Sequence, residues 1–268
     1  MRELLEGIDT GYEGRFDFPS AAEPPAVTYL LASVPRAGST LFSHILWRTG
    51  CLGAPLEYLN FDPAGPYFFA ANSADAQREL WRSVLKRRTS PNGVFGLKAF
   101  PTQLQALQAR HPALLAEVLA TMLPRAGPRR LVYLRRRDRL AQTVSLARAA
   151  MSGVWRKEQE GREAAPLVYS DEALAAAERG IAVQEDLWER MFGDLALEPL
   201  RLWHEDVLAD PAAAAGRVAA YLGVAIDPAA AVAIPEIRKQ TRGDADAWAE
   251  RYAARVERTA REKGTRTF

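Results

Sequence analysis

Short apolar runs alternate along the chain with longer segments in which apolar residues recur at helical spacing. The apolar runs predict strands at about 27–34, 94–99, 130–135 and 199–203, because they are rich in β-branched, aromatic and leucine residues. The run at 130–135 lacks apolar–polar alternation, which is typical of a strand covered on both faces. Strands that alternate with helices predict an α/β fold with a parallel central sheet flanked by helices.

The helical segments carry apolar stripes with residues three or four positions apart. We expect helices at about 39–49, 75–88, 102–110, 112–123, 171–193 and 211–222, and two more around the stripes within 140–151 and 248–256. One stripe, predicted to face the core, consists of Leu140, Val144, Ala147 and Met151. Two other sets each lie on one face of a helix, the first of them roughly so: Leu174, Ile181, Trp188 and Met191; and Trp248, Tyr252 and Val256. Ser145 lies off its stripe, so its hydroxyl is available for another role.

The segments outside these elements differ in character. Residues 1–26 end close to two prolines and predict a loosely structured lead-in, whereas 27–268 predict a single domain. Long loops are expected at 51–73, which is rich in aromatic residues, and at 152–170, which is charged and contains glycine. We expect the second loop to be mobile and both loops to lie beside a binding site.

The composition narrows the possible functions. The 268 residues are 48% hydrophobic, enough for one sizeable core, and 35 basic against 33 acidic side chains give a net charge of +2, which argues against nucleic-acid or membrane partners. One cysteine and three histidines without metal-ligand spacing exclude an internal disulfide and predict no metal site. Charges interrupt the first twenty positions and no long apolar stretch follows. We therefore expect no signal peptide, no transmembrane segment and a cytoplasmic location.

The most informative stretch lies between the first predicted strand and the first predicted helix: Arg36-Ala37-Gly38-Ser39-Thr40. A loop in this place directs backbone N–H groups and the positive end of a helix at one point, as in phosphate and sulfate sites. Gly38 allows close approach of the backbone, and Arg36 adds a permanent charge. Ser39 and Thr40 add hydroxyl donors. The alternative is an ordinary turn in which Ser39 caps the helix.

This loop departs from the motif that binds nucleoside triphosphates. Gly38 is followed by Ser39 instead of a lysine, and the upstream glycine of that motif is missing. The departure argues against transfer of a γ-phosphate. It favours a ligand that has a 5′-phosphate but no triphosphate chain.

Three further groups follow predicted strands or the first helix. Glu57 lies in the loop after the first helix, Lys98 ends the second strand, and the cluster Arg135–Arg137 ends the third. Because the carboxyl ends of parallel strands meet at one edge of a sheet, we expect these groups to gather near the Arg36–Thr40 loop. Three cationic features and one carboxylate suit a ligand with two anionic groups, together with a hydroxyl that must lose its proton.

Several blocks of sequence follow one another in a specific order. They are Pro35-Arg36-Ala37-Gly38-Ser39-Thr40-Leu41; Gly50-Cys51-Leu52-Gly53-Ala54-Pro55-Leu56-Glu57-Tyr58; Asn92-Gly93-Val94-Phe95-Gly96-Leu97-Lys98; and Arg136-Arg137-Asp138 with Ala141-Gln142-Thr143-Val144-Ser145 and Val154-Trp155-Arg156. Together they resemble the bacterial trehalose 2-sulfotransferase family over about residues 27–160, with weaker similarity at 203–223 and around Trp248. The resemblance implies the P-loop-like sulfotransferase architecture and, as in relatives, a homodimer.

The resemblance implies a reaction and a donor. The enzyme would move the sulfuryl group of 3′-phosphoadenosine 5′-phosphosulfate (PAPS) to a hydroxyl of a carbohydrate or another small acceptor, without a metal. It places the 3′-phosphate on Arg136 and Ser145; Arg135 or Arg137 are alternatives to Arg136, because the family often has proline where this chain has Arg137. It places the 5′-phosphosulfate on the backbone of Ala37–Thr40 and on the side chains of Arg36, Ser39 and Thr40.

The resemblance also implies catalytic roles. Glu57 matches the carboxylate that acts as general base, a role worth about 10²–10⁴ in rate. His44 is the competing base, because many other sulfotransferases use histidine. Arg36 would stabilise charge on the sulfuryl oxygens. Lys98 would contact the sulfuryl group or the acceptor, and the alternative for it is a lysine at the surface end of a strand.

Two other functions stay open at this point. One is a small-molecule kinase on the same kind of sheet, and the other is a nucleotide- or glycan-binding module without transfer activity. The sequence does not specify the acceptor, and contacts of Trp155 and of the basic run 238–242 with a ligand also stay open. Aromatic residues that suit stacking on sugar rings or flat apolar groups are Tyr58, Phe61, Tyr67, Phe68, Phe69 and Trp155.

Overall fold

Four parallel strands form the central sheet of this computed structural model, which describes residues 9–63, 65–155, 157–159, 167–237 and 243–264. The strands are β1 (Val27–Ala32), β2 (Val94–Ala99), β3 (Leu131–Arg135) and β4 (Leu200–Trp203), in the order β2-β1-β3-β4. The four predicted strands and the parallel α/β fold are confirmed.

The order of the strands determines where a ligand can bind. From β1 the chain crosses to β2 on one side and then returns to β3 on the other side. The strand order therefore reverses beside β1, and in open α/β sheets ligands bind at the carboxyl ends of the strands at such a point. The Arg36–Thr40 loop follows β1 and lies at this point.

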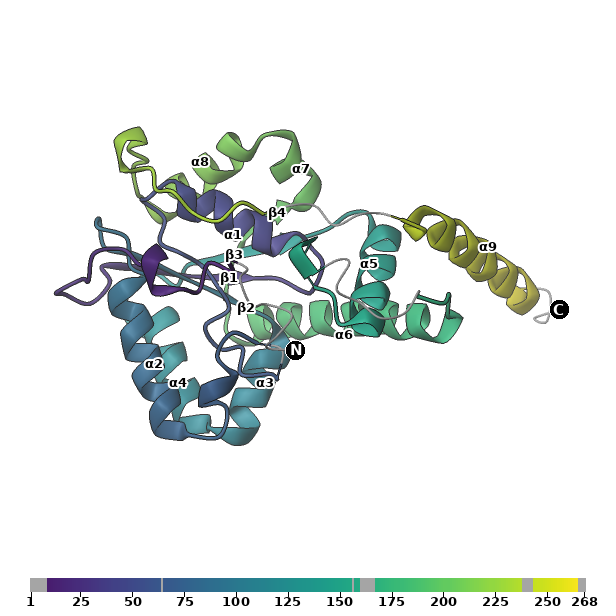
Figure 1. Cartoon of the computed structure of the whole chain (residues 1–268), viewed down its shortest axis with the longest axis horizontal. Helices are drawn as coiled ribbons and strands as arrows, with labels where there is room; N and C mark the ends of the chain where they lie inside the picture. Colours follow the sequence, from purple (N-terminus) through teal and green to yellow (C-terminus); the bar gives the residue numbers. More distant parts are fainter. Residues whose placement is uncertain (1–8, 64, 156, 160–166, 238–242, 265–268) are drawn as a thin grey trace.

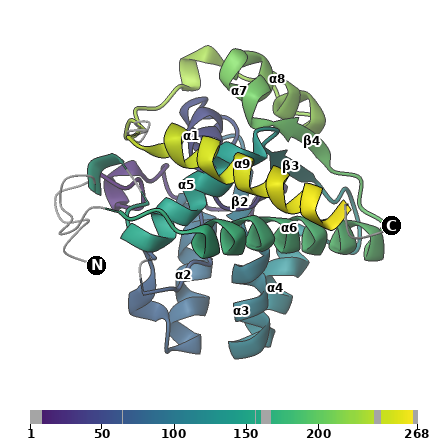
Figure 2. The same cartoon turned by 90° about the vertical axis from the view of Figure 1, so that its right-hand side faces the viewer.

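Helices cover both faces of the sheet (Figure 1). On one face lie α1 (Ser39–Arg48), α7 (His204–Ala209) and α8 (Pro211–Leu222); on the other lie α2 (Ala74–Arg87), α3 (Pro101–Arg110), α4 (Pro112–Met122) and α6 (Asp171–Asp194). α5 (Arg139–Ser152) packs against α6, and α9 (Ala245–Gly264) lies across these two helices (Figure 2). The short 3-10 turns are η2 (Gly14–Phe16), η3 (Phe68–Ala70), η4 (Lys157–Gln159) and η5 (Pro228–Ala230).

The sheet is buried on both faces, which explains the uninterrupted apolar runs. In β1, Leu30 and Ala32 pack into the core against α2, α4 and α6, whereas Tyr29 and Leu31 pack into the core against α1 and α8. β3 divides its residues in the same way. The prediction that the third strand is covered on both faces is confirmed. None of the helices in the described ranges is long and apolar enough to cross a lipid bilayer.

Two residues of the predicted stripes are exposed. Met151, assigned to a core stripe, is 39% exposed, and Val256 is 46% exposed. In α6, Met191 is half-buried and packs against the core, and the neighbouring Phe192 is buried. Residues 156 and 160–166 of the loop predicted to be mobile, and the basic run 238–242, lie outside the described residues.

Arg88 ties the lead-in to the body of the protein. Its side chain is 3% exposed, donates to the carbonyls of Gly11 (2.9 Å) and Glu13 (3.2 Å), and places Nε 2.9 Å from a carboxylate oxygen of Asp17. The guanidinium also lies over the ring of Trp47. The described part of the lead-in, predicted to be loosely structured, is therefore held by specific contacts although η2 is its only regular turn.

We predict that Arg88→Met lowers the free energy of unfolding by about 3 kcal/mol, because it leaves the Asp17 carboxylate and two carbonyls without their buried partner. Urea unfolding measures this change. Arg87→Met is the matched control, since Arg87 is 60% exposed and 3.8 Å from the same carboxylate. It should change stability by about 0.5 kcal/mol at most. Equal losses in the two variants would show that Arg88 does not anchor the lead-in.

Candidate functional site

The loop between β1 and α1 has a strained backbone. Gly38 directly precedes α1 with φ +81°, and Arg36 also lies in the left-handed region at φ +61°. A Cβ on residue 38 would lie 2.1 Å from Nδ1 of His204, so both the backbone and the packing require glycine. In the part of the chain that is described, no side chain caps α1. The first N–H groups of the helix therefore face the loop, which suits the predicted anion site.

α5 holds this loop in place from one side. Gln142 is fully buried and donates from Nε2 to the carbonyl of Pro35 at 2.9 Å. The Oγ of Ser145 accepts from Nε of Arg36 at 2.8 Å, and the carbonyl of Trp155 accepts from Nη1 of Arg36 at 3.0 Å. The position of Ser145 off the apolar stripe thus places its hydroxyl against the loop.

Two guanidinium groups lie side by side at this loop. Nη1 of Arg136 donates to the carbonyl of Arg36 at 3.4 Å. Burial, and then repulsion from the Arg136 charge, lower the pKa of Arg36 to about 10. Two neighbouring cations at the positive end of a helix repel each other, and a bound anion would remove this repulsion. The electrostatics of the loop therefore favour an anionic ligand.

The structure separates the three consecutive arginines that end β3. Arg135 turns toward α6, where Nη2 lies 3.2 Å from a carboxylate oxygen of Glu185. Arg137 makes a bidentate pair with Asp206, at 2.6 and 2.8 Å. Arg136 faces the loop after β1. Of the three, Arg136 is the one that the structure brings beside Arg36.

Glu57 lies at the outer edge of the sheet, beside β2. Leu56 forms a parallel bridge with Leu97, and the N–H of Lys98 donates to the carbonyl of Leu56 at 3.0 Å, which places Glu57 next to Lys98. The backbone N–H of Glu57 donates to the hydroxyl of Tyr12 at 3.1 Å. The lead-in and the edge strand together therefore fix this segment.

The Glu57 carboxylate has a partner on each oxygen. Oε1 lies 2.9 Å from Nζ of Lys98; Oε2 accepts from Nε2 of Gln103 at 2.9 Å and from Nδ2 of Asn60 at 3.2 Å. Burial alone would raise the pKa of this carboxyl, but the Lys98 charge and the two amide donors outweigh burial and lower it below its ordinary value of 4.5. Glu57 is therefore ionised at neutral pH.

Lys98 connects the Glu57 carboxylate with the loop after β1. Its side chain is 1% exposed, so the surface lysine considered as an alternative is wrong. Nζ donates to Oγ1 of Thr40 at 3.0 Å and pairs with Glu57 at 2.9 Å. A cation that contacts both groups brings the candidate base to the edge of the candidate anion site.

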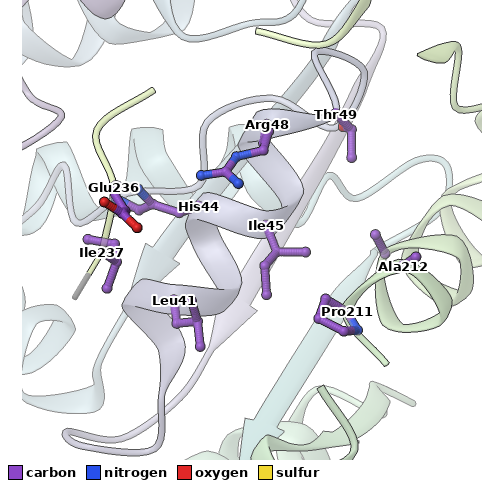
Figure 3. A pocket seen from close by; sticks show the side chains of 10 residues that line it. Leu41, His44, Ile45, Arg48, Thr49, Pro211, Ala212, Glu236 and Ile237 are labelled. Carbon is purple, nitrogen blue, oxygen red and sulfur yellow. The ribbon is translucent and has the colours of Figure 1, made fainter. Parts of the chain in front are cut away.

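His44 has other surroundings than Glu57. Its ring is buried, with Nδ1 3.0 Å from the carbonyl of Pro235. The ring lines a cavity of about 420 Å³ between α1 and α8 (Figure 3). The other residues of that lining are Leu41, Ile45, Arg48, Thr49, Pro211, Ala212, Ala215, Glu236 and Ile237. The structure thus pairs Glu57, and not His44, with Lys98.

The aromatic residues of the two long loops differ in exposure, and Phe61 is half-buried against the core. Tyr58 and Tyr67 are buried and belong to the core, so they are not available for stacking on a ligand. Phe68, Phe69 and Trp155 are exposed. Of these, Trp155 is the one whose backbone contacts Arg36.

Several residues that hold the site in shape were given no role on the basis of the sequence. They are Gln103, Asn60, Gln142 and His204. Pro101 followed by Gln103 carries the signal of a helix start, but it does not reveal a contact with Glu57, 46 residues away. Within the described ranges, no three His, Cys, Asp or Glu side chains are arranged to hold a metal ion.

Comparison with solved structures finds partial likenesses that include two sulfotransferases. The sulfotransferase domain of the olefin synthase of Synechococcus PCC 7002 is 17% identical, covers 88% of this chain and 98% of its own, and has a TM-score of 0.42. A sulfotransferase from Alicyclobacillus acidocaldarius is 15% identical, covers 89% and 96%, and has a TM-score of 0.39.

Comparison with known sequences finds a family model and two relatives. Trehalose 2-sulfotransferase of Mycobacterium tuberculosis is 28% identical over 267 residues, and the protein of that name in Mycolicibacterium smegmatis is 26% identical over 258 residues. Each alignment covers 86% of this chain and 96% of the relative. The model of the Stf0 sulphotransferases matches residues 28–255, which is most of the chain. The protein therefore belongs to the Stf0 sulfotransferase family of enzymes.

Proposed function

We propose that the protein transfers the sulfuryl group of PAPS to a hydroxyl of a carbohydrate or another small acceptor, with Glu57 as general base. Membership of the Stf0 family supports sulfate transfer. The proposal rests on a chain of contacts that runs from Arg36 along the loop to Thr40, and from Thr40 through Lys98 to Glu57. These contacts join the positively charged loop, which is the candidate anion site, to an ionised carboxylate.

The residues at the loop fit a donor with two separate anionic groups. In this proposal the backbone of Ala37–Thr40, with Arg36, Ser39 and Thr40, holds the 5′-phosphosulfate at the start of α1. Arg136 and Ser145 hold the 3′-phosphate. The repulsion between Arg36 and Arg136 supports this assignment, because a doubly anionic ligand would lie between two cations, one of which lowers the pKa of the other.

The chemical step needs no group that this set of residues lacks. The acceptor oxygen forms a bond with sulfur while the bond from sulfur to the 5′-phosphate oxygen breaks, and the acceptor proton moves to Glu57. Arg36 and the N–H groups at the start of α1 stabilise the charge that grows on the sulfuryl and leaving oxygens. Lys98 contacts Thr40 and is close enough to this loop to share that role.

A carbohydrate acceptor is the class that we favour. The two relatives named above are called trehalose 2-sulfotransferases, and both align with 86% of this chain. Trp155 offers an aromatic ring, 40% exposed, on a segment whose carbonyl contacts Arg36. Sugar rings stack on such side chains while their hydroxyls bond to polar neighbours. We place the reaction in the cytoplasm, because a chain with one cysteine forms no internal disulfide and therefore needs no oxidising compartment.

We predict that the product adenosine 3′,5′-bisphosphate raises the melting temperature of the protein, with an increase that grows with the logarithm of its concentration above Kd, and that Mg-ATP does not. Arg136→Met should abolish this increase, because the 3′-phosphate loses its cation. Arg137→Met is the matched control, since Arg137 pairs with Asp206 at the surface, and it should keep the increase. Differential scanning fluorimetry measures all three proteins.

Two outcomes of that experiment would contradict the donor assignment. Stabilisation by Mg-ATP without stabilisation by the bisphosphate would favour the kinase. Loss of the effect in Arg137→Met, with retention in Arg136→Met, would move the 3′-phosphate to the other arginine. A separate assay with labelled donor tests transfer. Binding of the bisphosphate without transfer to any acceptor would favour the nucleotide-binding module.

We predict that Glu57→Gln lowers kcat at least about a hundredfold, because the amide cannot accept the acceptor proton. Glu57 is not among the residues assigned to the bisphosphate, so calorimetry should give an unchanged affinity for that ligand. Glu79→Gln, on the exposed face of α2, is the control and should keep full turnover. Wild-type turnover in Glu57→Gln, measured with labelled donor and a panel of sugars and phenols, would place the base elsewhere.

A further inference from the structure

The two oxygens of the Glu57 carboxylate have different surroundings. Oε2 accepts two amide hydrogen bonds, from Gln103 at 2.9 Å and from Asn60 at 3.2 Å. Oε1 has Lys98 at 2.9 Å, and that same ammonium group donates to Thr40 in the loop after β1. One oxygen therefore points to neutral amides and the other to the candidate anion site.

The orientation of the Gln103 amide is fixed by the start of α3. The backbone N–H of Phe100 donates to Oε1 of Gln103 at 3.0 Å, so the NH₂ group of the amide must face Glu57. Gln103 is buried and is the third residue of a helix that begins at Pro101. This hydrogen bond to the N-cap backbone holds the Gln103 amide in one orientation.

A carboxylate oxygen offers about two acceptor positions. We propose that Gln103 is a positioning residue of the reaction: together with Asn60 it fills both positions on Oε2 of Glu57, so that the proton of the acceptor hydroxyl goes to Oε1, beside Lys98. This inference rests on the proposed role of Glu57 as general base. Gln103 touches neither donor nor acceptor and acts through the carboxylate.

The proton balance agrees with this assignment. When the acceptor O–H bond breaks, an O–H bond forms at Oε1, and the acceptor oxygen bonds to sulfur with an electron pair. At the same time the bond from sulfur to the 5′-phosphate oxygen breaks, and its electron pair leaves with the bisphosphate. Oε2 then becomes the carbonyl oxygen of a neutral carboxyl group, which keeps both amide hydrogen bonds. The amides therefore hold Glu57 in place in both protonation states, whereas a proton on Oε2 would require one of them to leave.

Few of the described groups face the Glu57 carboxylate, so the effect of Gln103 on its pKa can be separated from the effects of its other neighbours. Lys98 on β2 is its charged neighbour, Gln103 on α3 and Asn60 in the following loop are neutral, and the hydroxyl of Tyr12 contacts the Glu57 backbone N–H. Removal of the Gln103 donor destabilises the ionised form of Glu57 relative to the protonated form. The pKa of Glu57 should therefore rise.

The test compares three substitutions. Gln103→Met keeps the size of the side chain and removes the donor. Gln103→Glu keeps an acceptor for the Phe100 N–H, and therefore the cap, but places a second carboxyl group against Glu57. Gln105→Met, on the exposed face of the same helix, is the matched control.

The pKa of Glu57 is read from the side-chain carboxyl ¹³C signals of glutamate-labelled protein, with Glu57→Gln to assign the resonance. Gln103→Met should raise this pKa and move the acid limb of the pH dependence of kcat upward. It should also lower kcat about tenfold, because the carboxylate is then held less precisely beside the acceptor. Gln103→Glu should raise the pKa further, because two carboxyl groups then share the site. The affinity for the bisphosphate should stay unchanged in all of them, and Gln105→Met should match the wild type.

An unchanged Glu57 pKa and acid limb in Gln103→Met would overturn the inference, even if that variant melts at a lower temperature, because a lower melting temperature alone reports only the helix cap. The carboxyl titration needs no turnover, which separates two failures. A raised pKa in a protein that transfers sulfate to no acceptor supports the positioning by Gln103 and contradicts the proposed reaction. A normal reaction with an unmoved pKa contradicts the positioning alone.

Discussion

The buried ion pair between Lys98 and Glu57 is the interaction on which the site depends. A lysine that is 1% exposed at the end of β2 has lost nearly all its water and requires a charged partner. Glu57 supplies the charge and Thr40 accepts a second hydrogen bond, so one ammonium group links the edge strand, the segment after α1 and the loop after β1. Any ligand that occupies the loop meets a carboxylate already held at its border.

The loop itself keeps a conformation that its sequence alone does not favour. Arg36 lies at φ +61°, which costs a residue with a side chain on the order of 1 kcal/mol or more. The surrounding contacts offset this cost: Gln142 holds the carbonyl of Pro35, and Ser145 holds the side chain of Arg36. Just before the loop, the hydroxyl of Ser33 donates to the carbonyl of Leu134, and the backbone carbonyl of Ser33 accepts from the ring N–H of Trp188. These contacts keep Arg36 in its left-handed conformation at the start of the loop.

The sequence predicted the features of the fold that depend on local patterns of apolar residues and on which residues follow each strand. The four strands, their parallel arrangement and the cover on both faces of β3 follow from apolar runs of strand length, and the loop of Arg36 to Thr40 follows from its place between a strand and a helix. Burial of Lys98 was left open, because it depends on a glutamate 41 positions earlier in the chain coming to the edge of β2. The contact of Gln103 with Glu57 was not predicted. The sequence pattern of a helix start is the same whether or not the NH₂ group of the glutamine donates to a carboxylate.

A carboxylate with a lowered pKa is a weak base, and this limits how the proposed reaction can proceed. Water and alcohols lose a proton only at pH values far above neutral. A carboxylate such as Glu57, whose pKa lies below its ordinary value of 4.5, therefore cannot deprotonate a free hydroxyl to any useful extent. The proton can move only once the acceptor oxygen has begun to bond to sulfur, because that bond makes the hydroxyl strongly acidic. What the site must then provide is a base that is always ionised, correctly oriented and next to the anion loop. Lys98 keeps the carboxylate ionised, and Gln103 with Asn60 holds it in place. Precise placement can therefore replace basicity in this site, since an oriented weak base serves a late proton transfer better than a mobile strong one.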